Sequence, residues 1–312
     1  MSPGSGWYDG PVVDAHHHFW EPSLGHQPWL RPEVLIPFRY GDYTAIKKDY
    51  LPADLRRDAA AAGIDLVGSV TMETEWTDTD EVGEVVYTEA FAASTGLPTA
   101  IVAHATLDRP DVADTLAELS AHDLVRAVRD KPGQSIDPTE PAVTRLSDPA
   151  WRAGFVQLAS HGLDFELQTA WWQFEEAFSL LAASPDVGVT INHAGLPSDR
   201  SPGALDAWTH ALGLLAELDH VRIKISGIGV PGTRWTADLQ RPVVEACVEA
   251  FGVERTMFAS NFPVDSLTAT YPEVWDGFRQ LTAAWSRSEQ QSVFAGTAVQ
   301  TYRLPAGLLT TA

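Results

Sequence analysis

The stretch VVDAHHHFW, residues 12–20, is an apolar, β-branched run that leads directly into three histidines, a phenylalanine and a tryptophan. Such a run indicates a buried β-strand near the start of the chain. In doubly wound α/β folds the first strand is usually followed by a glycine-rich turn that binds phosphate. No such turn follows here, so the fold has to be inferred from the strands that come after this one.

Seven further short apolar runs follow, and helical stretches separate them. The candidate strands occupy residues 12–18, 66–72, 98–105, 124–129, 163–169, 187–193, 221–226 and 255–260. The stretch 51–63 is a typical helix between two of them, with Gly63 as its end, and Asp111 is placed as the N-cap of another. Eight strands that alternate with helices predict a (β/α)8 TIM barrel, an α/β fold, as a single domain over residues 1–312.

Composition and charge restrict the class of protein. The 312 residues are 45% hydrophobic and 20% charged, which is typical of a globular protein. The net charge of −21, with no run of Lys or Arg, argues against a nucleic acid or an anionic membrane surface as partner. No membrane span and no signal peptide are expected, so we predict a cytoplasmic protein that acts on a small molecule, with homo-oligomers left open. The single cysteine, Cys247, rules out an internal disulfide and a cysteine-built zinc site, and its helical context predicts packing.

Residues 19–50 form the longest irregular segment, and they are rich in Pro, Trp, Tyr and Arg. In a barrel this segment is the first βα loop, which lies over the mouth of the site at the carboxyl ends of the strands. Trp20 and Trp29 of this loop, with Gln168 and Trp171 at the end of the fifth strand, are candidates for binding the substrate. Tryptophan is also common in cores, so for each one taken alone packing is the favoured interpretation.

The histidines of the opening stretch differ in direction. Alternate residues of a strand share a face, so His16 and His18 are predicted to point into the barrel and His17 away from it. Two neutral imidazoles at this spacing can bind one divalent ion. The alternative is a buried pair that hydrogen-bonds to its neighbours.

Two residues on other strands could join this pair. His193, in VTINHAGLP, ends the sixth strand, and a barrel brings strand ends together, so it can converge on the first two histidines. Glu73 ends the second strand and is a further candidate ligand, although a surface carboxylate is an equal alternative. The predicted metal ligands are therefore His16, His18, His193 and Glu73.

The last strand and the fourth strand supply other polar candidates. MFASNFPVDSL places Asn261 at the end of the eighth strand, and an amide has no capacity as a general base. Asp265 follows four residues later, where a loop can return it to the site or where it can simply cap a turn. Arg129 ends the fourth strand and suits a substrate carboxylate or an oxyanion, with a salt bridge to one of the many acids as the alternative.

An ordered set of motifs carries a resemblance to a known family. DAHHHFW, DYLPADL, NHAGLP, FASNFPVD and the terminal TA-Q-YRL pattern resemble the amidohydrolase-2 branch of the amidohydrolase superfamily, from about residue 11 to residue 304. This branch consists of TIM-barrel hydrolases predicted to depend on a metal, and it includes several lactonases. The resemblance implies a distorted barrel, a site at the carboxyl ends of the strands and hydrolysis of an ester-like or amide-like bond.

The resemblance also implies roles for particular residues. His16, His18 and His193 match the family's histidines, whereas Asn261 stands where many members have an aspartate that activates water. Gln168 stands at a strand where a histidine or a carbamylated lysine would complete a second metal site. One divalent ion, with zinc as the first choice, or no metal at all, is therefore expected in place of a two-metal centre.

The sequence favours a lactone hydrolase, with His16, His18, His193, Asn261 and Asp265 as the catalytic group. Two alternatives stay open. One is a non-hydrolytic enzyme, a decarboxylase of an aromatic or muconate-type acid, because fold does not fix reaction. The other is a barrel that has lost catalysis and only binds a ligand.

Overall fold

Eight parallel strands form one sheet in the order of the chain, β1-β2-β3-β4-β5-β6-β7-β8. The computed structural model describes residues 6–77, 80–135, 137–140 and 144–309. The strands are β1 (Pro11–His17), β2 (Asp65–Met72), β3 (Ala100–His104), β4 (Val125–Arg129), β5 (Asp164–Leu167), β6 (Val189–Ile191), β7 (Val221–Ile225) and β8 (Thr256–Phe258). Each overlaps a candidate strand, so the predicted (β/α)8 barrel is confirmed.

The barrel closes just beyond the end of β8. Asn261 N–H donates to His16 O at 2.8 Å, and His18 N–H donates to Phe262 O at 2.8 Å. These two bonds join the first strand to the segment that follows the last one. The residues that close the barrel are therefore the same ones that the sequence singles out for the site.

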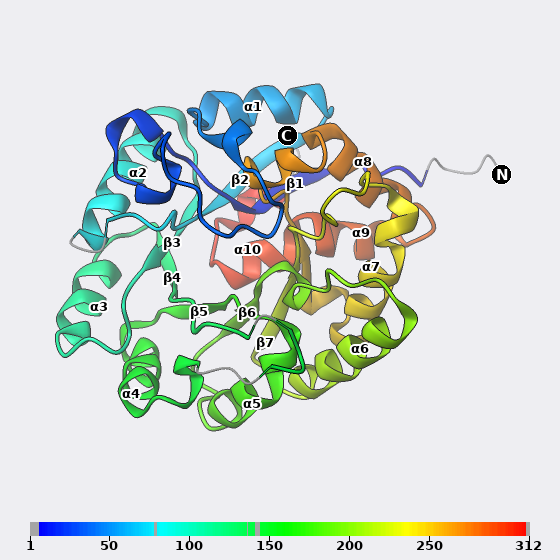
Figure 1. Cartoon of the computed structure of the whole chain (residues 1–312). Helices are drawn as coiled ribbons and strands as arrows, with labels where there is room; N and C mark the ends of the chain where they lie inside the picture. The colour runs from blue at the N-terminus through cyan, green and yellow to red at the C-terminus, as the bar shows by residue number, and fades with distance from the viewer. Residues whose placement is uncertain (1–5, 78–79, 136, 141–143, 310–312) are drawn as a thin grey trace.

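Helices surround the strands as an outer ring (Figure 1). They are α1 (Pro52–Ala61), α2 (Glu81–Thr95), α3 (Val112–Ser120), α4 (Pro149–Gln157), α5 (Phe174–Ala182), α6 (Pro202–Ala216), α7 (Ala237–Phe251) and α8 (Tyr271–Leu281). The sequence explains α8 well: Thr270 and Glu273 form a capping box, and one apolar face buries Trp275 and Phe278. Cys247 is fully buried on α7, as predicted. None of the helices in the described part of the chain is long and apolar enough to cross a membrane.

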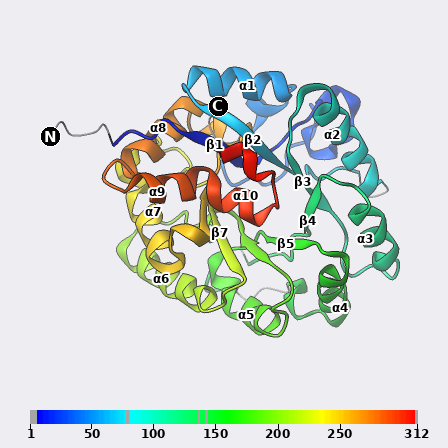
Figure 2. The same ribbon diagram turned by 180° about the vertical axis from the view of Figure 1, so that it is seen from behind.

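The carboxyl-terminal helix covers the opposite end of the barrel from the first loop. It runs through α9 (Arg287–Gln291), a π-helical turn (Ser292–Gly296) and α10 (Thr297–Thr301), and α10 lies across the strands in Figure 2. Small and apolar side chains from inside the barrel pack against Tyr302 and its neighbours, among them Val13, Ala127 and Met257. This packing closes the lower end, so access to the interior is from the side of the first loop.

The first βα loop, residues 19–50, is well fixed although it contains only short 3-10 turns. The ends of the loop pair, since Trp20 and Tyr50 exchange backbone hydrogen bonds. Trp20, Leu30, Tyr43 and Ile46 form a small apolar cluster that also includes Val264, beyond β8. The predicted long loop over the site is therefore a packed layer, and it packs against the segment that follows the last strand.

Candidate active site

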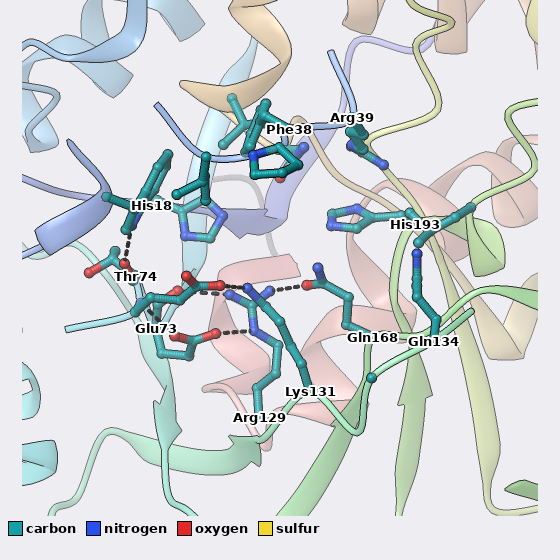
Figure 3. A pocket seen from close by; sticks show the side chains of 18 of the residues that line it. His18, Phe38, Arg39, Glu73, Thr74, Arg129, Lys131, Gln134, Gln168 and His193 are labelled. Carbon is teal, nitrogen blue, oxygen red and sulfur yellow. Dashed lines mark hydrogen bonds and ion pairs between the residues drawn. The ribbon is translucent and has the colours of Figure 1, made fainter. Parts of the chain in front are cut away.

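A pocket of about 340 Å³ opens at the carboxyl ends of the strands, beneath the first loop. Its walls come from the ends of several strands and from the loop. The lining includes His18, Trp20, Trp29, Phe38, Arg39, Glu73, Arg129, Lys131, Gln134, Gln168, His193, Leu196 and Asn261. Figure 3 shows His18 and His193 facing each other across this space, with Arg129 and Glu73 below them.

The direction of the three consecutive histidines depends on an irregularity in β1. Val13 and Ala15 pack inside the barrel, so simple alternation would also turn His17 inward. The pairing of β1 with β2 shifts register between Asp14 and His17, which is the signature of a β-bulge. Beyond it, the His16 ring lies 5.3 Å from that of His18, whereas the His17 ring packs beside Phe19 at 4.4 Å. His16 and His18 thus share a face, as predicted.

Three imidazoles come together at this end of the pocket. The centroids of the His16 and His193 rings are 4.6 Å apart, although the two residues come from different strands. His18 Nδ1–H donates to Met72 O at 3.3 Å, and His193 Nδ1 is hydrogen bonded to the Ser226 hydroxyl at 2.9 Å. Neither ring nitrogen of His16 has a partner among the described residues. Ring nitrogens of the cluster are therefore free to meet a ligand.

Burial keeps these imidazoles uncharged. Removal from water lowers the pKa of His18 to about 3 and lowers the pKa values of His16 and His193 well below the usual range. Neighbouring positive charges act in the same direction, Arg129 on all three rings and Arg39 on His193. Neutral imidazole is the form that binds a metal ion or accepts a proton, so the cluster is prepared for either role.

The backbone around His193 is strained. His193, Ala194 and Leu196 all have left-handed conformations, with φ of 54°, 52° and 61°. Asn261 shares this conformation, with φ of 55°. Left-handed non-glycine residues cost free energy and cluster at functional sites. The strain supports a functional assignment for the ends of β6 and β8.

The histidine cluster has the donors that a divalent ion needs. A zinc–nitrogen bond is about 2.0–2.1 Å, which puts the ring centroids of two ligands of one ion roughly 5 Å apart. The separations of 4.6 and 5.3 Å, the neutral rings and the two free nitrogens of His16 all agree with this. No group of three or more ligating side chains is already arranged around one point in the described residues, so the ring nitrogens would have to turn toward an ion.

Below the two histidines, the pocket is lined by a buried ion pair (Figure 3). Arg129 Nε donates to Glu73 Oε1 at 2.5 Å, and Arg129 Nη2 donates to Glu73 O at 2.8 Å. The second carboxylate oxygen of Glu73 accepts from the backbone N–H of Glu75 at 2.7 Å. Burial by itself raises the pKa of Glu73, but Arg129 and Lys131 outweigh it and hold the pKa well below its usual range. Glu73, a predicted metal ligand, thus has both oxygens bound to the protein.

Gln168 connects this ion pair to the pocket. Its Oε1 accepts from Arg129 Nη1 at 2.8 Å (Figure 3), which leaves the amide N–H groups of Gln168 for a ligand. Arg129 therefore orients a donor in addition to carrying charge itself. Of the tryptophans that the sequence suggests for substrate binding, Trp20 and Trp29 line the pocket, whereas Trp171 lies outside its lining and packs edge-on to Trp172.

Asn261 and Asp265 form a second connected pair. Asn261 Nδ2 donates to Asp265 Oδ1 at 2.7 Å, and the Tyr40 hydroxyl donates to the same oxygen at 3.0 Å. The amide oxygen of Asn261 is thus left as an acceptor toward the pocket. Asp265 is buried behind Asn261 and does not line the pocket, and burial raises its pKa to about 6. The Asp265 carboxylate is therefore separated from the pocket by the side chain of Asn261.

Below the pocket, polar groups continue into the barrel. Lys224 of β7 is fully buried, and its Nζ donates to Glu166 Oε1 at 3.0 Å. Glu166 also accepts from Asn192 and from the Tyr302 hydroxyl. Burial lowers the pKa of Lys224 to about 8, with Glu166 acting against this effect. This paired cluster joins the helix at the closed end of the barrel to the floor of the site.

Several lining residues were not among the sequence candidates: Phe38, Arg39, Lys131, Gln134 and Leu196. Arg39 and Phe38 belong to the first loop, which the sequence marked as a whole, but composition could not select single residues within it. Lys131 and Gln134 follow Arg129 in the chain. Proximity to a strand end was the signal that could have indicated them.

Comparisons with known proteins agree with this architecture. A sequence profile of the family described as Amidohydrolase matches residues 13–304. The uncharacterized protein y4mH of Sinorhizobium fredii is 38% identical over 301 residues, which are 95% of this chain and 99% of that protein. An L-fucono-1,5-lactonase of Burkholderia multivorans is 26% identical over 309 residues, covering 94% of this chain and 96% of the relative.

Solved structures show the same fold. An amidohydrolase of Burkholderia multivorans with bound zinc superimposes with a TM-score of 0.78 at 24% identity, over 95% of this chain and 100% of the other. A second structure of an amidohydrolase from that organism, with bound HEPES, gives a TM-score of 0.77 at 25% identity over the same shares. The arrangement of strands and helices is thus shared along nearly the whole chain.

Proposed function

The chain belongs to the amidohydrolase family, and we propose that it hydrolyses a small cyclic ester, a lactone. The observation that carries this proposal is the convergence of three neutral histidines, of which His18 and His193 line a pocket that also presents amide and guanidinium donors, while His16 is fully buried beside them. The similarity to L-fucono-1,5-lactonases over 94% of the chain supports a lactone as the substrate.

The chemistry requires a nucleophilic water, stabilisation of an oxyanion and a proton for the leaving ring oxygen. Without a bound ion, His193, which lines the pocket with a neutral imidazole, takes up the proton of the attacking water. The Gln168 amide, oriented by Arg129, donates to the carbonyl oxygen as negative charge develops on it. When the ring C–O bond breaks, the protonated imidazole returns its proton to the departing oxygen.

Asn261 positions the reactants in this scheme and does not exchange protons. Its Nδ2 is held by Asp265, so its Oδ1 accepts a hydrogen bond from the water or from a substrate hydroxyl. With a divalent ion held by His16, His18 and His193, the ion would polarise the carbonyl and make the water more acidic, and the three imidazoles would then serve as ligands and not as bases. Glu73 stays with Arg129 in this proposal, because both of its oxygens already have partners.

The proposal is tested with a panel of five- and six-membered lactones, by following acid release with a pH indicator. We expect the wild type to hydrolyse at least one sugar lactone and the double variant His16→Ala/His193→Ala to lose that activity. His17→Ala is the matched control, because His17 is equally buried and its ring has no hydrogen-bond partner among the residues that the structure describes, but it faces away from the pocket. Elemental analysis of the same preparations reports bound metal.

Equal activity of the wild type and the double variant on every lactone would overturn the proposal. Release of CO2 from aromatic acids, without lactone hydrolysis, would replace it with the decarboxylase alternative. A melting temperature for each variant separates loss of the site from loss of the fold.

A further inference from the structure

A second cavity of about 290 Å³ adjoins the pocket. The two cavities share Arg39, Gln134 and Leu196 in their linings, so they lie on either side of these three side chains. The rest of the second lining is mostly apolar or backbone, and includes Tyr40, Trp172 and Gly227. The cavity borders the space where the proposed reaction occurs and is nearly as large as that space.

Trp172 gives this second cavity a fixed flat surface. Its indole N–H donates to the Ser135 hydroxyl at 2.8 Å, and that hydroxyl donates to Asp137 O at 2.8 Å. The ring also packs edge-on to Trp171, with centroids 5.4 Å apart. Trp172 remains partly exposed. An indole that is held in place and faces a cavity is a suitable platform for a second flat ring.

The boundary between the cavities depends on a glycine. Gly227 has φ of +56°, and a Cβ there would lie 2.4 Å from Arg39 Nη2 and 2.6 Å from His193 Nδ1. The missing side chain therefore lets the Arg39 guanidinium approach the His193 ring. Figure 3 shows Arg39 and Gln134 on the same side of the pocket as His193. A group that passes from one cavity to the other would run beside the histidine cluster.

Arg39 has capacity left for such a group. Its Nη2 donates to the Tyr40 hydroxyl at 2.9 Å and lies 3.7 Å from Asp265 Oδ1. Within the described part of the chain, no acceptor is hydrogen bonded to its Nε or Nη1, and its side chain is 31% exposed. Guanidinium N–H groups bind oxygen acceptors in a fixed geometry. Arg39 can thus hold an oxygen that links two rings.

We propose that the second cavity is a subsite for a second ring of the substrate, so that the preferred lactone carries a further flat-faced ring joined through an oxygen-bearing link. The lactone ring lies between His18, His193 and Asn261, the link passes Arg39, and the outer ring lies on Trp172. This inference rests on the proposed lactone hydrolysis and specifies its substrate class. A second sugar and an aryl group share this chemistry, because both offer a flat apolar face.

The test compares kcat/KM for a one-ring aldonolactone, a disaccharide aldonolactone and an aryl-substituted lactone. We expect the wild type to favour a two-ring substrate by about 10-fold, which corresponds to about 1.4 kcal/mol. Trp172→Ala should abolish the preference for two rings and leave kcat/KM for the one-ring substrate within about twofold of the wild-type value. Trp172→Phe should retain most of the preference, because it keeps a flat ring. The better of the two-ring substrates identifies the outer ring as sugar or aryl.

A binding measurement makes the test independent of turnover. Calorimetry with the open-chain two-ring and one-ring acids should show a Trp172-dependent affinity for the two-ring acid alone. The subsite is overturned if the wild type has no preference for two-ring substrates, or if Trp172→Ala lowers kcat/KM equally for the one-ring and the two-ring substrates. If no lactone is hydrolysed but the two-ring acid still binds in a Trp172-dependent way, the lactonase proposal fails and the subsite stands.

Discussion

Two walls of the pocket differ in whether their buried polar groups have hydrogen-bond partners. On the wall built from β1 and β6, the His16 ring has no hydrogen-bond partner within the part of the chain that the structure describes, and His18 and His193 are each bonded through Nδ1. On the wall built from β2 and β4, Arg129 and Glu73 are bound to each other and to neighbouring groups. Both walls are buried, so exposure to water does not explain the difference.

The difference separates binding groups from supporting groups. A buried polar atom without a partner costs free energy, and where such an atom faces a pocket a ligand can supply the missing bond. A buried ion pair that is fully bonded already has its partners and fixes the positions of its neighbours. We therefore expect changes in the histidine wall to act mainly on catalysis, whereas changes in the ion-pair wall, which orients Gln168, lower stability in addition to their effect on catalysis.

The largest expected effect is on catalysis. His193→Ala should lower kcat/KM for the preferred lactone by about 10²–10⁴-fold, the range for loss of a group that moves protons. The unfolding free energy of His193→Ala should change much less than that of the Arg129→Met variant described next. Steady-state kinetics and urea denaturation check both parts. If His17→Ala, the matched control, loses as much activity, the assignment of the two faces of β1 is wrong.

The next effect is on stability. Arg129→Met leaves the Glu73 carboxylate buried without its partner and should lower the unfolding free energy by about 3–5 kcal/mol. The double variant Arg129→Met/Glu73→Met removes both charges and should recover more than half of that loss. Urea denaturation of the wild type, both single variants and the double variant gives the coupling free energy. Additive losses would show that the pair does not support the wall as described.

Asp265 offers an intermediate case, a buried acid that is only partly compensated. Burial raises its folded-state pKa to about 6, so its contribution to stability is complete at low pH and is lost as pH rises through that value. The unfolding free energy of the Asp265→Asn variant, relative to that of the wild type, should therefore rise by about 2–3 kcal/mol between pH 4 and pH 8. Denaturation curves at several pH values measure this rise, and a pH-independent difference would contradict it.

The smallest expected effect comes from restoring a carboxylate at the end of β8. Asn261→Asp replaces the donor to Asp265 with a like charge and should cost about 1–2 kcal/mol of stability at pH 8, with little cost at pH 5. The same change in an Asp265→Asn background should be nearly neutral at both pH values. A large gain in lactone turnover would instead mean that position 261 lacks a base that the reaction still uses.

The fold was accessible from the sequence because its signals are local. Each strand is a short apolar run, and each is separated from the next by a helical pattern that can be recognised without its partners. The first loop was also recognisable, since 32 residues without regular periodicity are unusual in a compact domain. The roles of its individual side chains could not be predicted, because Arg39 lies close to Gly227 and Tyr40 donates to Asp265, and both of these partners are far along the chain.

The sequence by itself determined the barrel, the positions of its strands and the presence of histidines and Asn261 at strand ends. Only the tertiary structure decided which way these groups face and what they contact. The bulge in β1 turns His16 inward, Arg129 meets Glu73 across 56 residues, and Tyr40 meets Asp265 across 225. Periodicity reports which residues are buried, but hydrogen bonds between distant strands decide which buried groups are satisfied and which remain for a ligand.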